Sequence, residues 1–330
     1  MKNILNKLFN YQSLEKEEAR EILTNLASGA YNHSQMAAFM TVFMMRNITV
    51  DELSGFRDAM LELCIKIPAE GYNAIDLCGT GGDGKDTFNI STLASFVVAG
   101  AGYHVAKHGN YGVSSVCGSS NVLEYLGCKF FSDVGRIMKS FDQSNIAFLH
   151  APLFHPAMKN VAPIRKELGV KTFFNMLGPM VNPAAPMNQM VGVFNLELAR
   201  LYGYLYQNTD KNFLIVHSLD GYDEISLTGD FKYIFNEGEA IGTPSLLGLS
   251  YLDAVDLSGG SDIKSSAQLF KEILDCKGTD SQNNVVIANA GMAIATINGS
   301  PFEAAVEEAR TSLISGKAKS TFSKFLEINA

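Results

Sequence analysis

Apolar residues recur every three or four positions through the first part of the chain, a pattern that predicts amphipathic helices. Ser13 is placed to cap a helix that ends at Gly29. Further along, Thr49 and Glu52 have the spacing of a capping box, which predicts the start of another helix. We therefore predict a small all-helical domain over residues 1–70.

From residue 74 onward, short apolar runs alternate with helical stretches. That alternation is typical of βαβ units, so residues 71–330 are predicted to form a larger α/β domain with a mostly parallel central sheet and flanking helices. The segment 231–250 fits this pattern less well, and we predict antiparallel edge structure there. The runs predicted to be buried strands are residues 74–78, 103–106, 146–150, 189–194, 212–218 and 285–290.

One segment of the second domain does not follow the alternation. Residues 156–187 contain five of the nine prolines and no convincing strand. Proline removes a backbone donor, which makes a central strand unfavourable. We expect this segment to leave the sheet and to pack beside the N-terminal helices.

The bulk properties narrow the class of protein. The 330 residues carry a net charge of −8, which disfavours broad contact with a nucleic-acid backbone. Polar residues interrupt the apolar positions at the N-terminus, so neither a signal peptide nor a membrane segment is predicted. Five widely spaced cysteines without a C-x-x-C pair are typical of a reduced protein, and we expect a cytoplasmic location.

The run CGTGGDGK, residues 78–85, matches two nucleotide-binding patterns in part. A dinucleotide fold needs an acidic residue about 20 positions after the glycines. No Asp or Glu occurs in residues 87–122, so that interpretation fails. A P-loop needs Ser or Thr directly after the lysine, but Asp86 follows Lys85. What remains is a glycine-rich turn at a strand end that can offer backbone N–H groups to an anion.

The next strand also ends in a loop of glycines, serines and a cation, residues 106–127. The carboxyl ends of neighbouring parallel strands share one edge of a sheet, where ligands of open α/β sheets bind. Two such loops predict a ligand with phosphate at both ends, or a phosphate beside a second anion. For the first loop, the alternative is a tight turn followed by an ordinary capped helix.

Several long motifs in order, GTGGDG, NIST, KHGN, RKELGVKTFFNMLGP and DGYDEIS, resemble the anthranilate phosphoribosyltransferase family. The resemblance implies a small helical domain joined to a larger α/β domain of the nucleoside phosphorylase and phosphoribosyltransferase type. It also implies a homodimer formed through the small domains. The implied reaction transfers the phosphoribosyl group of 5-phosphoribosyl 1-diphosphate (PRPP) to the amine of anthranilate in tryptophan biosynthesis.

The resemblance assigns most of the glycine and serine positions to PRPP. Mg²⁺, expected as two ions per subunit, would neutralise the diphosphate through oxygen ligands. Alone, the Asp-Glu pair after the strand 212–218 would be read as solvated surface. The implied metal ligands are Ser91, Asp223 and Glu224. The implied PRPP contacts are Gly79, Gly82, Asp83, Thr87, Asn89, Ile90, Ser91, Thr92, Lys107, Ser115 and Ser119.

For the acceptor, the resemblance implies contacts with Gly79, Asn110 and Arg165. Arginine suits a carboxylate because its guanidinium can donate two parallel hydrogen bonds. Without the motif, Arg165 would be one charge on an exposed helix face. Lys107, His108 and Arg165 are the implied catalytic residues, although His108 could equally have a structural role.

The chain departs from the family at Tyr111-Gly112, where members commonly have Arg-Ala. Two alternatives stay open on the sequence. A pyrimidine nucleoside phosphorylase would share the fold but not the KHGN loop or the segment around Arg165. A catalytically silent nucleic-acid-binding relative would have a basic face, which the charge of −8 disfavours.

Overall fold

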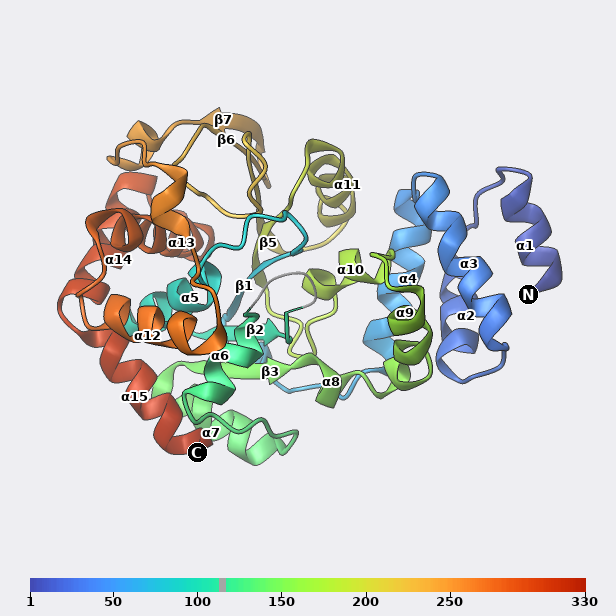
Figure 1. Ribbon diagram of the computed structural model, residues 1–330, viewed down its shortest axis with the longest axis horizontal. Helices are drawn as coiled ribbons and strands as arrows, with labels where there is room; N and C mark the ends of the chain where they lie inside the picture. Colours follow the sequence, from blue (N-terminus) through green and yellow to red (C-terminus); the bar gives the residue numbers. More distant parts are fainter. Residues whose placement is uncertain (113–116) are drawn as a thin grey trace. The chain divides into compact units, whose positions relative to one another are not determined.

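The computed structural model describes residues 1–112 and 117–330, and contacts divide the chain into two compact units (Figure 1). The first unit, here called the helical unit, combines Met1–Ile67 with Ala151–Pro183. The second, the α/β unit, combines Pro68–His150 with Ala184–Ala330. The proline-rich segment falls in the helical unit up to Pro183, and its last residues fall in the α/β unit.

The helical unit is held together by aromatic rings from distant parts of the sequence. Phe173 stacks on Phe56, with ring centroids 4.5 Å apart, and its edge meets Phe39 and Phe43. All four rings are buried, so the second segment completes the apolar core of the first. The elements of this unit are α1 (Lys2–Phe9), α2 (Lys16–Ala27), α3 (His33–Met45), α4 (Val50–Leu63), α8 (Ala151–Phe154), η2 (Pro156–Asn160), α9 (Ala162–Leu168), α10 (Phe174–Leu177) and η3 (Gly178–Met180).

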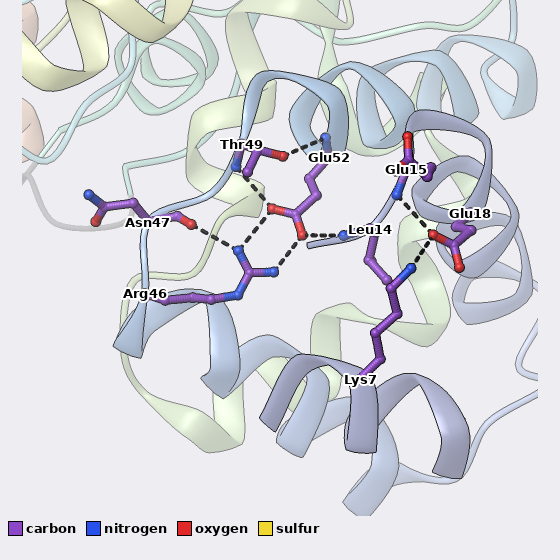
Figure 2. Close-up of polar contacts among 8 residues, drawn as sticks. All are labelled: Lys7, Leu14, Glu15, Glu18, Arg46, Asn47, Thr49 and Glu52. Atoms are coloured by element: carbon purple, nitrogen blue, oxygen red, sulfur yellow. Dashed lines mark hydrogen bonds and ion pairs between the residues drawn. The ribbon is translucent and has the colours of Figure 1, made fainter. Parts of the chain in front are cut away.

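The starts of α2 and α4 are fixed by capping boxes (Figure 2). Thr49 and Glu52 form the predicted capping box at the start of α4. The prediction that Ser13 caps the preceding helix is wrong, because the cap of α2 is Glu15, two residues later, and the helix begins at Lys16. Glu15 and Glu18 form a capping box at the start of α2, in which the Glu18 carboxylate accepts from the Glu15 backbone N–H at 2.9 Å.

Glu52 does more than cap a helix. Its carboxylate is fully buried and accepts from the Arg46 guanidinium and from the backbone N–H groups of Thr49 and Leu14 (Figure 2). Burial alone would raise the pKa of Glu52, but these hydrogen bonds hold it below its usual value. One carboxylate thus joins the end of α3, the start of α4 and the chain before α2.

The α/β unit is built on a seven-stranded sheet with the order β3-β2-β1-β4-β5-β6-β7. The first five strands in that order are parallel, whereas β6 and β7 are antiparallel. The predicted mostly parallel sheet is therefore confirmed, as is the antiparallel edge. The strands are β1 (Ile75–Gly79), β2 (Val105–Gly109), β3 (Ile146–His150), β4 (Asn188–Gly192), β5 (Asn212–Ser218), β6 (Phe231–Phe235) and β7 (Gly238–Gly242).

Helices cover the sheet and complete its core (Figure 1). The run 285–290, predicted as a strand, is wrong: it lies inside the 19-residue helix α13. Its apolar residues are buried on every side, so the pattern lacks the period of an amphipathic helix. The remaining elements are η1 (Glu70–Tyr72), α5 (Ile90–Gly100), α6 (Ser119–Tyr125), α7 (Val134–Ser144), α11 (Leu196–Tyr206), η4 (Pro244–Leu247), η5 (Ala254–Leu257), α12 (Ile263–Leu274), α13 (Asp280–Asn298), α14 (Phe302–Ile314) and α15 (Lys317–Asn329).

Hydropathy gives little sign of a membrane segment in the described part of the chain. No single helix there is long and apolar enough to cross a bilayer, and only α13 and α14 taken together pass on length and composition, with a bend of 119° between them.

The strand order positions a site. From β1 the chain crosses through α5 to β2 on one side, whereas from β4 it crosses through α11 to β5 on the other. Right-handed crossovers in opposite directions place these two helices on opposite faces of the sheet. The carboxyl ends of β1 and β4 therefore flank a topological switch point, where open α/β sheets bind ligands.

Candidate active site

Two paired glycines end the strands at the switch point. Gly79 of β1 lies opposite Gly192 of β4, and Asp223, from the loop after β5, packs against both. A Cβ atom on Gly79 would lie 2.3 Å from Asp223 Oδ2, and one on Gly192 would lie 1.5 Å from the Asp223 carbonyl oxygen. Only glycine permits this approach, which brings an acidic loop to the ends of two strands.

The glycine-rich loop that follows β1 is tied down at its start. The Thr80 N–H donates to the Gly192 carbonyl at 2.9 Å, and the Gly81 N–H donates to Asp223 Oδ2 at 2.6 Å. Gly81 and Gly82 have positive φ angles of 67° and 86°, so the turn depends on glycine. In the same loop, Asp83 accepts from the Lys85 N–H, and Thr87 forms an isolated β-bridge with Ser258.

The loop leads into the N-terminus of α5. Asn89 precedes the helix, but its side chain donates to the Cys117 carbonyl at 2.9 Å instead of capping. This contact joins the first loop to the second. Ile90 is buried, and Ser91 and Thr92 follow in a first turn that carries no acidic residue. The free N–H groups and partial positive charge of a helix start favour a bound phosphate.

Asp223 is buried at this edge, and Glu224 beside it is half-buried with its Oε2 atom enclosed. Burial and the nearby charge of Asp83 raise the pKa of Asp223 to about 7. Burial and the charges of Asp223 and Asp83 raise the pKa of Glu224 well above its usual value. The two carboxylates and Ser91 line a cavity of about 10 Å³, large enough for about one water molecule.

This arrangement fits a divalent cation. Glu224 Oε1 accepts from the Ser91 N–H at 3.1 Å, whereas the buried Oε2 has no hydrogen-bond partner among the described residues. The buried Oγ1 atoms of Thr80 and Thr92 also have no hydrogen-bond partner in that part of the chain. Among the described residues, no group of three or more His, Cys, Asp or Glu side chains is placed to hold a metal ion. Two carboxylates with one hydroxyl suit Mg²⁺, which keeps several waters or substrate oxygens as ligands.

Lys107 and His108 lie within β2, beneath the loops. Lys107 is 2% exposed, and its ammonium group donates to the Leu77 carbonyl at 2.5 Å and to Ser91 Oγ at 3.4 Å. Burial lowers the pKa of Lys107. The His108 backbone N–H donates to Asp76 Oδ1 at 3.2 Å. Sequence reasoning missed Asp76, although a charge inside a predicted buried strand was a signal.

The second loop is organised by Asn110. Its carbonyl accepts from Ser119 Oγ at 3.2 Å and from the Ser120 N–H at 3.1 Å. The predicted contact Ser115 lies outside the described residues. Tyr111, the departure from the family, donates through its hydroxyl to Glu124 and sets its ring edge against His150, 4.8 Å between centroids.

Arg165 belongs to the helical unit, on α9, whereas all the other described site residues belong to the α/β unit. Its guanidinium donates to Asn175 Oδ1 at 3.2 Å and lies 5.3 Å from the Phe174 ring centre. Burial lowers the pKa of Arg165, so the residue is not the exposed charge of the alternative interpretation. Sequence reasoning missed Asn175, which also accepts from the Thr172 N–H.

Comparison with known proteins identifies the family to which both units of the chain are similar. The glycosyl transferase family α/β domain matches residues 71–319, and the helical bundle domain of that family matches residues 2–64. The anthranilate phosphoribosyltransferase of Flavobacterium psychrophilum is 64% identical over 329 residues, a match that covers 100% of each chain to the nearest per cent.

Solved structures agree on the fold. That of the anthranilate phosphoribosyltransferase from Thermus thermophilus covers 98% of both chains with a TM-score of 0.92 and 32% identity. That of the Saccharomyces cerevisiae enzyme in complex with PRPP and Mg covers 98% of this chain and 96% of its own, with a TM-score of 0.89. At 24% identity the latter shows the fold alone. The predicted fold class and family are confirmed: the chain belongs to the anthranilate phosphoribosyltransferases of tryptophan biosynthesis.

Proposed function

We propose that this chain transfers the phosphoribosyl group of PRPP to the amine of anthranilate, giving N-(5-phosphoribosyl)anthranilate and diphosphate in a Mg²⁺-dependent reaction. The single observation that carries the chemistry is the carboxylate pair at the switch point, beside a glycine loop and the start of α5. Such a pair is unfavourable unless a cation accompanies it, and a cation there would face the diphosphate.

The diphosphate would be bound by main-chain groups more than by side-chain cations. The loop from Gly79 to Asp83 and the first turn of α5, from Asn89 to Thr92, would contact it, together with the hydroxyls of Ser91 and Thr92. The N–H groups of Thr80, Gly81 and Ser91 already donate within the fold, so these contacts would come from the remaining main-chain groups. Thr87, Lys107 and Ser119 would complete the contacts on the remaining phosphoribosyl atoms, with Ser115 from the second loop. Main-chain donors are preorganised, so they stabilise developing charge without reorganising.

Ser91, Asp223 and Glu224 would hold Mg²⁺, and two ions per subunit remain our proposal. The fit rests on Glu224 Oε2, which has no hydrogen-bond partner in the described part of the chain, and on the oxygen atoms of the three donors. When bound, the metal supplies charge neutralisation for the departing diphosphate. The two carboxylates hold their position through the N–H groups of Gly81 and Ser91.

Anthranilate would be recognised through its carboxylate by Arg165, with Asn110 and the main chain of Gly79 as further contacts. The guanidinium is held by Asn175 and the Phe174 ring, which leaves other donors of the fork for a ligand. The aryl amine is neutral at pH 7, so a strong general base is not required. Positioning and electrostatic stabilisation of an oxocarbenium-like transition state would carry most of the rate, with His108 orienting the acceptor or taking its proton.

We also propose a homodimer formed through the helical unit and a cytoplasmic location. Exposed apolar side chains on this unit, among them Tyr11 and Met45, support the former. All five cysteines are free, and two of them are buried, which supports a reducing compartment.

The direct test is whether the protein consumes anthranilate in the presence of PRPP and Mg²⁺. Consumption is measured as the loss of anthranilate fluorescence. Arg165→Ala should mainly raise the KM for anthranilate, whereas Asp223→Asn should raise the Mg²⁺ concentration needed for half-maximal rate. Lys166→Ala, an exposed neighbour on the same helix, is the matched control and should behave as wild type. Absence of both turnover and anthranilate binding by calorimetry would overturn the proposal, and identical defects in the two variants would overturn the division of roles.

A further inference from the structure

Tyr111 is a residue of the second loop for which the proposed function has no role. It stands where members of the family commonly have arginine, and it directly follows Asn110, the proposed anthranilate contact. Although Tyr111 is 39% exposed, its ring lies edge-on to His150, with centroids 4.8 Å apart and an angle of 77° between the planes. This is one of the arrangements that aromatic pairs prefer. The ring of Tyr111 is therefore held by the fold instead of being surrounded by water.

His150 is a firm support for that ring. It ends β3, is buried, and stacks on Phe130 with ring centroids 4.5 Å apart and an angle of 20° between the planes. Its Nδ1 atom shares a hydrogen bond of 2.8 Å with the Oγ atom of Ser120, a buried residue in the first turn of α6. The imidazole is fixed both by a stacked ring and through a ring nitrogen, so Tyr111 packs against a group that cannot shift freely.

These contacts form a closed circuit around Asn110. The Ser120 N–H donates to the Asn110 carbonyl at 3.1 Å, and the Tyr111 N–H donates to Asn110 Oδ1 at 2.8 Å. Ser120 and Tyr111 are in turn joined through His150. The main chain and the side-chain oxygen of Asn110 are thus both held from residues of the circuit.

The circuit decides what Asn110 offers to a ligand. Because Oδ1 already accepts from the Tyr111 N–H, the group that the Asn110 side chain turns to a ligand is its NH₂ group, which donates hydrogen bonds. Anthranilate carries a carboxylate, which accepts them. The orientation of this amide therefore suits the acceptor that the proposed function requires.

The ring of Tyr111, more than its hydroxyl, holds the circuit. The hydroxyl donates to Glu124 Oε1 at 3.2 Å, but both residues are exposed there. Water competes for an exposed hydrogen bond, so its net contribution is small. The packing of the ring on His150 has no such competitor.

We propose that Tyr111 is a positioning residue for anthranilate, whose ring, packed on His150, keeps Asn110 in the orientation that presents its amide donors to the carboxylate of the acceptor. This inference rests on the proposed function. Tyr111 acts through Asn110 and not by contact with substrate, so an aromatic support takes the place of the cation that is common in the family.

Tyr111→Ala is the first test, because it removes the ring and leaves the main chain. The KM for anthranilate is expected to rise about 10- to 100-fold, the loss typical of a hydrogen bond to a charged group. The KM for PRPP should stay within about threefold of wild type, since the glycine loop and α5 are untouched. The Tm should stay at the wild-type value, because Asn121 Oδ1 still accepts from the N–H groups of Gly112 and Gly118.

Two further variants show whether the ring is the part that matters. Tyr111→Phe keeps the ring and removes only the hydroxyl, so both KM values should stay within about threefold of wild type. Tyr125→Ala removes another exposed tyrosine, at the end of α6, and should behave as wild type. A KM for anthranilate raised as far by Tyr111→Phe as by Tyr111→Ala would contradict the role given to the ring.

A double-mutant cycle with His150 tests the circuit itself. His150→Ala removes the support, so adding Tyr111→Ala to it should raise the KM for anthranilate no further. His150→Phe keeps an aromatic ring there, so Tyr111→Ala should retain its full effect in that background, which keeps the test decisive if His150→Ala does not fold. Full multiplication of the effects of Tyr111→Ala and His150→Ala would overturn the inference, as would loss of the Tyr111→Ala effect in His150→Phe.

The kinetics of Tyr111→Ala also separate positioning from general damage. A wild-type KM for anthranilate in this variant would overturn the inference. Equal rises in both KM values together with a lower Tm would overturn it too, since they would show a loop that is disturbed as a whole. Absence of turnover in the wild-type protein would instead overturn the proposed function.

Discussion

At the residue scale, Glu52 and Glu224 show what an enclosed carboxylate can be used for. Glu52 accepts from a guanidinium and from two backbone N–H groups, so its charge is fully compensated and its pKa falls. Glu224 has one backbone partner, a like charge beside it and a raised pKa. The first is a structural ion pair, whereas the second has the incomplete solvation expected of a cation ligand.

Gly79→Ala tests the close approach of Asp223 to the strand ends. The added methyl group would overlap Asp223 Oδ2, so the carboxylate must move away from the Gly81 N–H and from Ser91. Displacements of this size can cost about 100-fold in rate, and we expect kcat/KM to fall by that factor with a higher Mg²⁺ requirement. Steady-state kinetics across a Mg²⁺ titration measure both effects.

Gly71→Ala is the control for this substitution, because a Cβ atom there would have no neighbour within 4 Å. It should leave the kinetics and the Tm at wild-type values. Wild-type Mg²⁺ dependence in Gly79→Ala would show that Asp223 is not held against β1 during turnover.

At the element scale, the helical unit depends on the junction that Glu52 forms among α2, α3 and α4. Glu52→Gln should lower the free energy of unfolding by about 3 kcal/mol at pH 7, because Arg46 is left without its buried counter-charge. The folded-state pKa of Glu52 lies below its usual value of 4.5, so its contribution is complete above that pH and is lost as the pH falls through the folded pKa. Chemical denaturation at neutral pH and at pH values below 4.5 measures this.

The difference in stability between wild type and Glu52→Gln should therefore shrink on acidification. Glu62→Gln, an exposed position on the same helix, should change stability little at either pH. A difference that stays constant across this pH range would contradict the account of Glu52 as an ionised, compensated carboxylate.

The elements also show how far the sequence predicts this protein. Strands β1 to β5 were predictable because each is a short apolar run between turn residues. The helix α13 was not, since burial on all sides removes the periodicity that distinguishes a helix from a strand. For the site, motif resemblance gave Asp223, Glu224 and Arg165, whereas Gly192 and Asn175 matter only through contacts made by the folded chain.

At the scale of the whole molecule, the exposed apolar side chains of the helical unit predict self-association. Tyr11 is 82% exposed and Met45 is 81% exposed, so both side chains are accessible to a second copy of the chain. Tyr11→Glu combined with Met45→Glu should give the mass of one chain in size-exclusion chromatography with light scattering, where wild type should give two. Tyr204→Glu, on α11 of the α/β unit, is the control and should leave the mass unchanged.

The closure of the helical core by Phe173 has a consequence for synthesis on the ribosome. Phe39, Phe43 and Phe56 leave the ribosome early, but their partner Phe173 follows only after strands β1, β2 and β3 have been made. At synthesis rates of about 5–20 residues per second, Phe173 is made on the order of 10 s after these three residues, whose rings lack this partner during that interval. The nascent N-terminus is therefore a natural client for chaperones that bind exposed aromatic segments.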